Sequence, residues 1–302
     1  MLHISQDKIS PLTADLLLTN NIMKKHSLAT IGIGRDKPTF IIAEAGINHN
    51  GDLKTAMKMV DAAKKAGANA IKFQTYITDL RVKRDNPVFN ILKECELSHT
   101  DLRKIKKYCD AKKIIFFSTP FDEISVRFLV ELRVPLMKVA SFDIVNHRLL
   151  KAMAATRIPA IISRGMASKK EIDAALRIFK REKCEFALLH CVSAYPTPNE
   201  KVNLHAIETL RNAYAVTVGY SDHTLGLEAC LYAVASGARV LEKHFTLNRT
   251  MKGPDQAMSA NPSDLTALVM KVREVETMMG SGNLAMSDVE KPARVFRRPS
   301  RA

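Results

Sequence analysis

The stretch Gly219–Phe245 reads GYSDHTLGLEACLYAVASGARVLEKHF and is the starting point for the architecture of this chain. It begins at the end of one apolar run, continues through a helical segment and reaches a second short apolar run. His223 follows the first run and His244 follows the second. If the runs are neighbouring parallel strands, both imidazoles lie at one rim of a sheet, an arrangement typical of metal ligands. Two unrelated histidines at strand ends are the alternative.

The same unit recurs along the chain as a short apolar run, a turn and a helical stretch. The runs lack polar alternation, as expected of strands that are buried on both faces of a parallel sheet. Eight such units in 302 residues predict an α/β fold, a (β/α)8 TIM barrel. An open doubly wound sheet is the rival, but the GxGxxG turn of a dinucleotide-binding sheet is absent after the first run. The runs are Phe40–Ala43, Ala70–Phe73, Ile114–Phe117, Leu136–Ala140, Ala160–Ile162, Phe186–Leu189, Ala215–Val218 and Val240–Leu241.

Helix signals stand between the runs, and a longer loop, Ile77–Leu97, follows the second run. The first helix is expected to turn Leu53, Ala56, Met57, Val60 and Ala63 toward the core. Helix starts are marked by Ser98-x-x-Asp101, Ser168-x-x-Glu171 and Asn261-Pro262.

Three segments are expected along the chain. Residues 1–28 form an N-terminal extension, for which disorder is one reading, residues 29–285 form the barrel, and residues 286–302 form a basic linker or tail.

The charge balance allows an anionic partner, since 46 Lys and Arg stand against 31 Asp and Glu and give a net charge of +15. The basic residues fall mostly on polar faces of predicted helices and in the tail after Lys291, without interleaved aromatic residues, so we predict no nucleic-acid partner. No apolar stretch is long enough to cross a membrane, so no membrane partner is expected either. Five cysteines without a CxxC pair indicate reduced thiols in a cytoplasmic protein.

The candidate site collects at the ends of the predicted strands, because the active site of such a barrel lies at its C-terminal rim. Two lysines and several hydroxyls directed at one mouth would bind an anion that carries a phosphate and a carboxylate. Taken singly, a buried lysine can simply pair with a carboxylate, and a serine can cap the next helix. The rim residues are Glu44, Lys72, Gln74, Ser118, Thr119, Lys138, Ser141, Ser163, His190, Ser193, Ser221, His223 and His244.

The two histidines make a poor structural zinc site, because no cysteine or third histidine stands near them. They better suit an open site for Mn²⁺, Mg²⁺ or a similar ion, in which water and substrate oxygens complete the coordination. Asp222, Glu242 and Asp255 are close in sequence and are candidates for supporting partners of the ligands.

With these residues in view, the chain resembles the sialic acid synthases from about Ala29 to Arg298. These are phosphoenolpyruvate-condensing enzymes that make N-acetylneuraminic, legionaminic or pseudaminic acids. The resemblance is carried by ordered motifs: FIIAEAGINHNGDLKTAMKMVDAAKKAGANAIKFQTY, STPFD, KVASFDI, LLHCVSAYPTP, GYSDHT, LEKHF and KGPDQAMSANP.

The resemblance implies a transferase that condenses phosphoenolpyruvate with an N-acylmannosamine-type amino sugar to give a nine-carbon 2-keto acid and phosphate. It implies a divalent metal, Mn²⁺ first and Mg²⁺ or Co²⁺ as alternatives, held by His223 and His244. Glu44, Lys72 and Lys138 would be catalytic. Phosphoenolpyruvate would be bound by Lys72, Thr119, Lys138, Ser141, Ser163, Ser193 and Ser221, and the amino sugar by Glu44, Gln74, Phe121, Tyr195 and Asp255.

The sequence also departs from the family pattern. Arg164 follows Ser163 where a serine or threonine is usual, and it would either add a phosphate contact or block one. Ser193 stands where some members have asparagine. Members continue after a linker like Phe296–Ser300 into a small antifreeze-like domain that supplies an arginine to the partner subunit, whereas this chain stops at Ala302. A homodimer and a separate antifreeze-like polypeptide are therefore the protein partners to consider.

Two alternatives stay open at this point. A condensation of phosphoenolpyruvate with a sugar phosphate, such as arabinose 5-phosphate, would need a second phosphate site, and no dedicated Arg/Lys cluster is evident in the loops. A non-catalytic or partner-dependent relative is the other alternative, since a fold alone does not fix a function.

Overall fold

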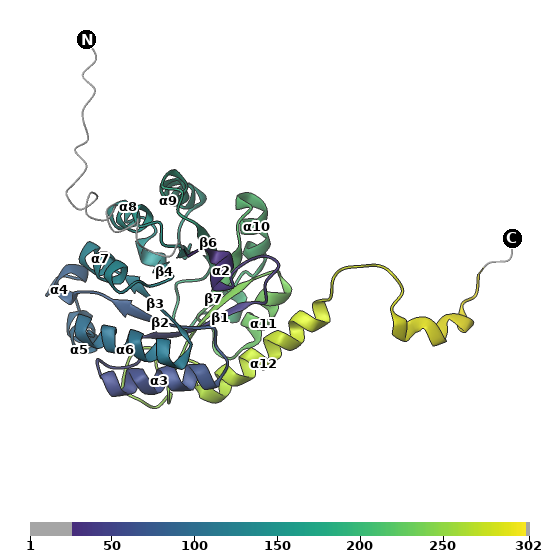
Figure 1. Cartoon of the computed structure of the whole chain (residues 1–302), viewed down its shortest axis with the longest axis horizontal. Helices are drawn as coiled ribbons and strands as arrows, with labels where there is room; N and C mark the ends of the chain where they lie inside the picture. The colour runs from purple at the N-terminus through teal and green to yellow at the C-terminus, as the bar shows by residue number, and fades with distance from the viewer. Residues whose placement is uncertain (1–25, 300–302) are drawn as a thin grey trace, which may run out of the picture.

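The computed structural model describes residues 26–299 and contains a closed barrel of eight parallel strands in chain order (Figure 1). The predicted TIM barrel is confirmed. The domain limits stay a prediction, and residues 1–25 of the predicted extension lie outside the described residues. The strands are β1 (Phe40–Gly46), β2 (Ala70–Thr75), β3 (Ile115–Pro120), β4 (Met137–Val139), β5 (Ala160–Ser163), β6 (Phe186–His190), β7 (Val218–Asp222) and β8 (Val240–His244).

Helices alternate with the strands and surround the barrel. The barrel helices are α3 (Leu53–Lys65), α6 (His99–Lys112), α7 (Glu123–Glu131), α8 (His147–Ala155), α9 (Lys169–Arg181), α10 (His205–Tyr214), α11 (Glu228–Ala235) and α12 (Pro262–Met279). Shorter pieces are α2 (Leu28–Ile31), α4 (Thr78–Arg81), α5 (Phe89–Cys95) and the 3₁₀ turns η1 (Ser141–Asp143), η2 (Asn199–Lys201) and η3 (Asp288–Phe296). Within residues 26–299, no helix combines the length and the apolar character that crossing a membrane requires.

The predicted helix starts agree with the observed caps. The Ser168 hydroxyl accepts from the backbone N–H of Glu171, and Asn261 caps α12 with Pro262 at its first position. Ser98 likewise accepts from the backbone N–H of Asp101. In α3 the predicted stripe is wrong at one position, since Met59 rather than Met57 is fully buried.

The barrel interior is built in two layers by the alternation of side chains along each strand. The lower layer is apolar and is closed from below by Leu28 and Ile33 of the α2 region. It contains Phe40, Ile42, Ala70, Phe117, Leu136, Ile161, Ala187, Leu189 and Val240. Two residues further along the strands, the inward positions are almost all polar: Glu44, Lys72, Thr119, Lys138, Ser163, Cys191, Ser221 and Glu242.

The polar upper layer explains why the predicted strand limits were wrong at several ends. Strands β1, β7 and β8 continue through polar residues to Gly46, Asp222 and His244, beyond the apolar runs. Ala215, predicted to begin the seventh strand, instead caps α10 in the left-handed conformation with φ of 55°. Hydrophobicity alone does not mark a strand whose last inward side chains belong to a site.

Candidate functional site

The C-terminal mouth of the barrel holds a pocket of about 830 Å³. Every residue to which the resemblance gave a role lines it except Ser193, which donates to the hydroxyl of the lining residue Ser141 at 2.9 Å. The predicted residues that line it are Glu44, Lys72, Gln74, Thr119, Phe121, Lys138, Ser141, Ser163, Tyr195, Ser221, His223, His244 and Asp255. The structure therefore brings the predicted set together, while the roles of its members stay predictions.

Glu242 and Lys72 lie at the centre of the upper layer. The Lys72 ammonium lies 2.9 Å from Glu44 Oε1 and 3.6 Å from Glu242 Oε2, and it donates to the Thr119 hydroxyl at 3.2 Å. Glu242 Oε1 accepts from the Ser221 hydroxyl at 3.0 Å and lies 3.9 Å from the ammonium of Lys138. All six side chains are buried, so the charges among them act on one another with little screening by water.

The two carboxylates of this cluster have opposite pKa shifts. Burial raises the pKa of Glu44 to about 7, against the opposing charge of Lys72 and with added repulsion from Glu242. Burial would also raise the pKa of Glu242, but the charges of Lys138 and Lys72 and the hydrogen bond from Ser221 outweigh it and lower that pKa to about 2. Glu242 is therefore a fixed anion near neutral pH, whereas Glu44 can take up and release a proton, which is the pattern of acid–base chemistry.

The lysines also differ. Burial lowers the pKa of Lys138, whose ammonium donates to the Ser163 hydroxyl at 2.7 Å and to the backbone carbonyl of Val139 at 2.9 Å. Burial would lower the pKa of Lys72 too, but Glu242 and Glu44 raise it above its usual value. Both ammonium groups stand beside hydroxyl donors at the base of the pocket, so together they can bind an anion.

His223 and His244 come together as predicted, with ring centroids 5.5 Å apart. Burial lowers the pKa of each to about 4, so both rings are neutral at neutral pH. His223 Nδ1 lies 2.6 Å from the carbonyl oxygen of Val192 and must donate to it, which leaves a lone pair on Nε2. His244 Nδ1 is buried without a hydrogen-bond partner among the described residues.

These two nitrogens fit a divalent metal, because neutral imidazoles with free lone pairs are the form that binds one. An added Cβ on Gly46 would lie 3.7 Å from His244 Nδ1, 3.5 Å from Glu44 Oε1 and 3.8 Å from Asp255 Oδ2, so the groups converge on one small space. Within residues 26–299, no cluster of three or more His, Cys, Asp or Glu side chains forms a complete metal cage. A metal here would therefore keep open positions for other ligands.

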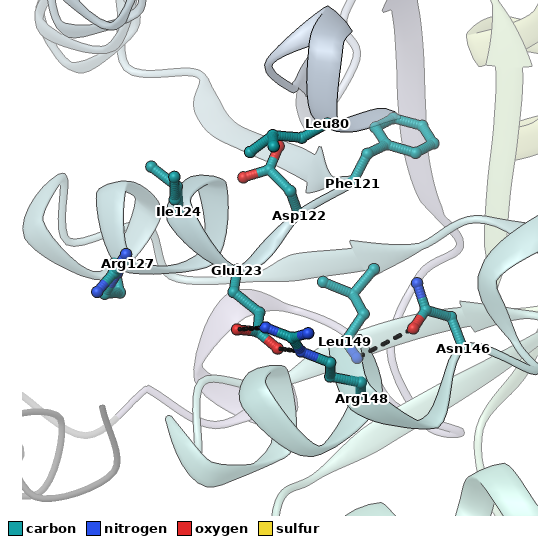
Figure 2. A pocket seen from close by; sticks show the side chains of 9 residues that line it. All are labelled: Leu80, Phe121, Asp122, Glu123, Ile124, Arg127, Asn146, Arg148 and Leu149. Atoms are coloured by element: carbon teal, nitrogen blue, oxygen red, sulfur yellow. Dashed lines mark hydrogen bonds and ion pairs between the residues drawn. The ribbon is translucent and has the colours of Figure 1, made fainter. Parts of the chain in front are cut away.

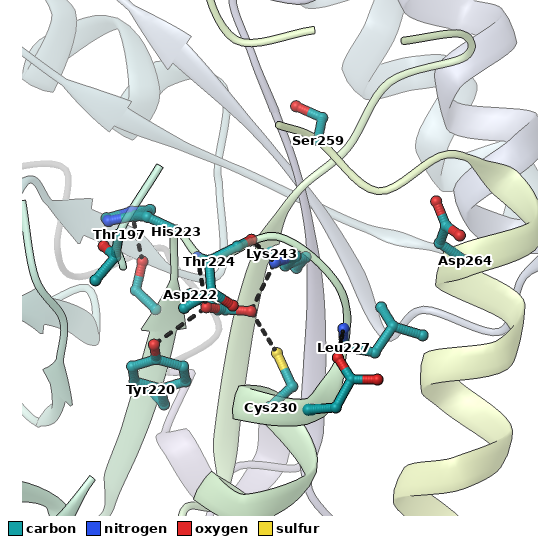
Figure 3. Close-up of polar contacts among 12 residues, drawn as sticks. Thr197, Tyr220, Asp222, His223, Thr224, Leu227, Cys230, Lys243, Ser259 and Asp264 are labelled. Atoms are coloured by element: carbon teal, nitrogen blue, oxygen red, sulfur yellow. Dashed lines mark hydrogen bonds and ion pairs between the residues drawn. The ribbon is translucent and has the colours of Figure 1, made fainter. Parts of the chain in front are cut away.

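A buried polar network outside the barrel fixes the two histidine-bearing strands (Figure 3). Lys243 donates to Asp222 Oδ2 and to the carbonyl of Thr224, each at 2.6 Å. Asp222 also accepts from the Tyr220 hydroxyl at 3.1 Å and from the Cys230 thiol at 3.3 Å. Because Asp222 and Lys243 are each the direct chain neighbour of a histidine, this ion pair fixes the separation of the two imidazoles.

The sugar-side predictions occupy the outer part of the pocket. The Tyr195 ring lies against His223, with centroids 4.2 Å apart and planes tilted by 34°, and Asp255 Oδ2 lies 3.7 Å from His244 Nδ1. Gln74 accepts a hydrogen bond at 3.0 Å from Arg81, whose guanidinium carbon lies 3.6 Å from the ring centroid of Phe121. This half of the pocket combines aromatic faces with hydrogen-bonding groups, as sites for small polar ligands do.

Some rim candidates face elsewhere. Ser118 bonds to the Thr75 hydroxyl at 2.7 Å and the carbonyl of Phe73 at 3.0 Å, outside the pocket. His190 lies between the carbonyl of Val202 and the side chain of Arg164, whose Nε lies 3.2 Å from His190 Nδ1. Arg164 is thus turned toward His190 and is absent from the pocket lining.

Glu242 and Arg81 line the pocket and were not predicted in these positions. Glu242, expected at most to support a metal ligand, lies between both lysines, and its place two residues before His244 on the same strand was a usable signal. Arg81 lies in the long loop after β2, where no periodic pattern could place it.

A second cavity of about 500 Å³ lies on the other side of Leu80 and Phe121 (Figure 2). Figure 2 shows the Arg148 guanidinium paired with Glu123 at its edge. Of the predicted site residues, Phe121 is the one that lines it among the described residues, so this cavity is a neighbour of the site and not a second copy of it.

Comparison with known proteins agrees with this geometry. Residues 59–284 match the NeuB family. The chain is 40% identical over 286 residues to the N,N'-diacetyllegionaminic acid synthase of Legionella pneumophila, covering 88% of this chain and 80% of that protein. It is 37% identical over 263 residues to the human N-acetylneuraminate-9-phosphate synthase, covering 82% and 73%.

A crystal structure provides the same link. The N-acetylneuraminic acid (sialic acid) synthetase of Leptospira borgpetersenii, solved in complex with citrate, superposes with a TM-score of 0.84 at 44% identity, covering 87% of this chain and 92% of that one. The chain therefore belongs to the NeuB family and is an enzyme of the sialic-acid-type synthase class.

Proposed function

We propose that this chain condenses phosphoenolpyruvate with an N-acylmannosamine-type amino sugar in a metal-dependent reaction, giving a sialic-acid-type nine-carbon 2-keto acid and phosphate. The observation that carries the proposal is the upper layer of the barrel. It sets two lysines, a fixed anion and a titratable carboxylate beside two neutral histidines in one pocket. Anion binding, proton transfer and metal binding are the three capacities that this reaction needs.

Phosphoenolpyruvate would lie over Lys72 and Lys138. Its phosphate and carboxylate match two ammonium groups with hydroxyl donors from Thr119, Ser163 and Ser221 around them. Glu242 keeps both lysines charged and oriented. Its negative charge also limits how tightly an anion binds, which helps phosphate to leave after the reaction.

The amino sugar would enter from the outer side, between Tyr195, Phe121 and Asp255, with its aldehyde directed toward His223 and His244. A divalent ion held by the two imidazoles, Mn²⁺ in this proposal, would act as a Lewis acid on the aldehyde oxygen. The ordered side chains hold the two reactants together, so that the reaction between them becomes effectively unimolecular.

The bond changes balance with one water. The methylene carbon of phosphoenolpyruvate attacks the aldehyde carbon, and positive charge develops at the carbon that bears the phosphate. Water adds at that carbon while the Glu44 carboxylate accepts a proton from it, as a pKa of about 7 allows. Collapse of this adduct breaks the bond between carbon and the phosphate oxygen. One proton of the water ends on the new hydroxyl and the other on the departing phosphate.

Two variants test the metal-dependent step directly. His223→Ala and His244→Ala should each abolish phosphate release from phosphoenolpyruvate with N-acetylmannosamine, and a chelator should stop the unmodified enzyme until Mn²⁺ is restored. His205→Ala, an exposed histidine on α10, is the matched control and should keep full activity. Activity that survives both variants or the chelator would refute the metal role.

A further inference from the structure

Arg81 is a cationic side chain that the sequence motifs do not include, yet it lines the pocket. It ends the short helix α4 in the long segment between β2 and α6. This helix is held in place, because the Glu96 carboxylate accepts from the backbone N–H of Thr78 at 2.9 Å and the Asp122 carboxylate from that of Ile77 at 3.2 Å. These contacts hold the start of α4, one helical turn before Arg81.

The guanidinium is oriented over the outer pocket. Its carbon lies 3.6 Å from the ring centroid of Phe121 and 4.6 Å from that of Tyr76, and Nη1 donates to Gln74 Oε1 at 3.0 Å. Stacking on an aromatic ring leaves the edge of a guanidinium available for hydrogen bonds. Only one of its five N–H donors is used by a described residue, so the others are available to a ligand.

The charges around Arg81 indicate what it would bind. Burial lowers the pKa of Arg81, and Tyr76 and the carboxylates of Asp143 and Asp255 oppose this shift, the two carboxylates without ion-pair contact. A phosphate dianion beside Arg81 would be repelled by those two carboxylates. A neutral acceptor such as an amide carbonyl would accept from Arg81 without that repulsion.

The wall beside Arg81 is apolar. Ile47, Tyr76 and Leu92 form a buried cluster with Val82 and Phe121 packed against it. Ile47, Val82, Leu92 and Phe121 line the same pocket as Arg81, and Phe121 is in contact with the guanidinium. A planar group with a carbonyl oxygen on one side and a small alkyl group on the other matches this surface.

We propose that Arg81 binds the N-acyl group of the sugar substrate, donating to its carbonyl oxygen while the acyl alkyl group packs against Val82, Leu92 and Phe121. The inference rests on the proposed function and names which part of the second substrate this segment recognises. Arg81 would then select N-acylated sugars over their hydroxyl counterparts. Phosphoenolpyruvate, at the base of the pocket, would be unaffected.

Steady-state kinetics with two sugars test this. Arg81→Ala should raise the KM for N-acetylmannosamine about ten- to a hundredfold, the loss expected for a hydrogen bond from a charged donor. The KM for phosphoenolpyruvate and the inhibition constant of mannose, which lacks the acyl group, should stay within about threefold. Arg81→Lys keeps the charge but not the planar fork, and it should recover only part of the loss.

Arg84→Ala is the matched control, because Arg84 is exposed on the same segment and pairs with Asp79. An equal loss for N-acetylmannosamine and mannose, or no loss for either, would overturn the inference while leaving the proposed function intact. The inference would also be overturned if the unmodified enzyme preferred N-acetylmannosamine 6-phosphate and Arg81→Ala lost this preference, because Arg81 would then bind phosphate. An unmodified enzyme without activity would instead refute the proposed function.

Discussion

The two inward-facing layers of the same barrel differ in almost every residue. In the lower layer Ile42, Phe117 and Val240 pack as a core, whereas two residues further along the same strands Glu44, Thr119 and Glu242 line the pocket. Both layers have the same backbone and the same alternation, so the chemistry of the side chains alone separates stability from function. One barrel strand can therefore contribute to both the core and the site, because inward-facing positions only two residues apart belong to different layers.

The largest effect is expected from Lys72→Met, which removes a charge from the upper layer. Phosphate release should fall at least about a thousandfold, because the anion loses one of its two ammonium groups in a site screened from water. The fold should be retained, since the methionine keeps the apolar stem. Initial rates at saturating phosphoenolpyruvate measure the effect.

Lys104→Met, an exposed lysine on α6, is the matched control and should change nothing. If Lys72→Met kept more than about a tenth of the activity, the upper layer would not be the anion site.

Phe117→Ala tests the lower layer. The free energy of unfolding should fall by about 3 to 5 kcal/mol, because a fully buried aromatic side chain is replaced by a cavity. Denaturant titration measures this, with Phe296→Ala as the exposed control. The folded variant should keep its KM for phosphoenolpyruvate within about threefold, and a change greater than tenfold would show that the two layers are not separable.

The pH dependence tests the titratable carboxylate. With Glu44 as the base, kcat/KM should rise about tenfold per pH unit below a pKa of about 7 and level off above it, since only the carboxylate accepts a proton. The free energy of unfolding should fall as the pH rises through the same region. Between pH 4.5 and about 7 the folded protein holds the Glu44 proton and the unfolded chain does not, so the stabilisation from this proton is present below pH 4.5 and is lost by about pH 7.

Glu44→Gln should remove both effects, whereas Glu208→Gln on the surface of α10 should remove neither. A rise in kcat/KM that persists with the same midpoint in Glu44→Gln would assign the proton transfer to another group.

The smallest effect is expected from Arg164→Ala. Arg164 directs its side chain to His190 and lies outside the pocket, so the KM for phosphoenolpyruvate should change by less than about threefold. A tenfold rise in that KM would place Arg164 in contact with the ligand. Thermal unfolding of the same variant would report the loss of the contact with His190.

Much of the fold followed from the sequence, and the reasons are physical. The eight apolar runs predicted eight strands because both faces of a parallel barrel strand are covered. Apolar runs did not predict where the strands end, because β7 and β8 continue into polar residues at the pocket. Alternation would have separated Ser118 from Thr119, because neighbouring residues of a strand face opposite sides and only Thr119 faces the pocket.

The site was predictable in its strand-end part and not in its loop part. Positions such as Lys72 and His244 are placed by strand geometry, which a local pattern reveals. The position of Arg81 depends on a contact with Phe121, forty residues away in the sequence, and on a short helix held by Glu96 and Asp122. Such contacts form only when the chain folds, so a local sequence pattern cannot predict them.

The most direct test of the account is the stoichiometry of the unmodified enzyme with phosphoenolpyruvate, N-acetylmannosamine or its 2,4-diacetamido relatives, and Mn²⁺. One phosphate should be released for each nine-carbon 2-keto acid formed, and none should be released when the sugar is left out. Phosphate release without sugar, or no release with any N-acyl sugar, would contradict the central claim that the upper layer of the barrel carries out this condensation.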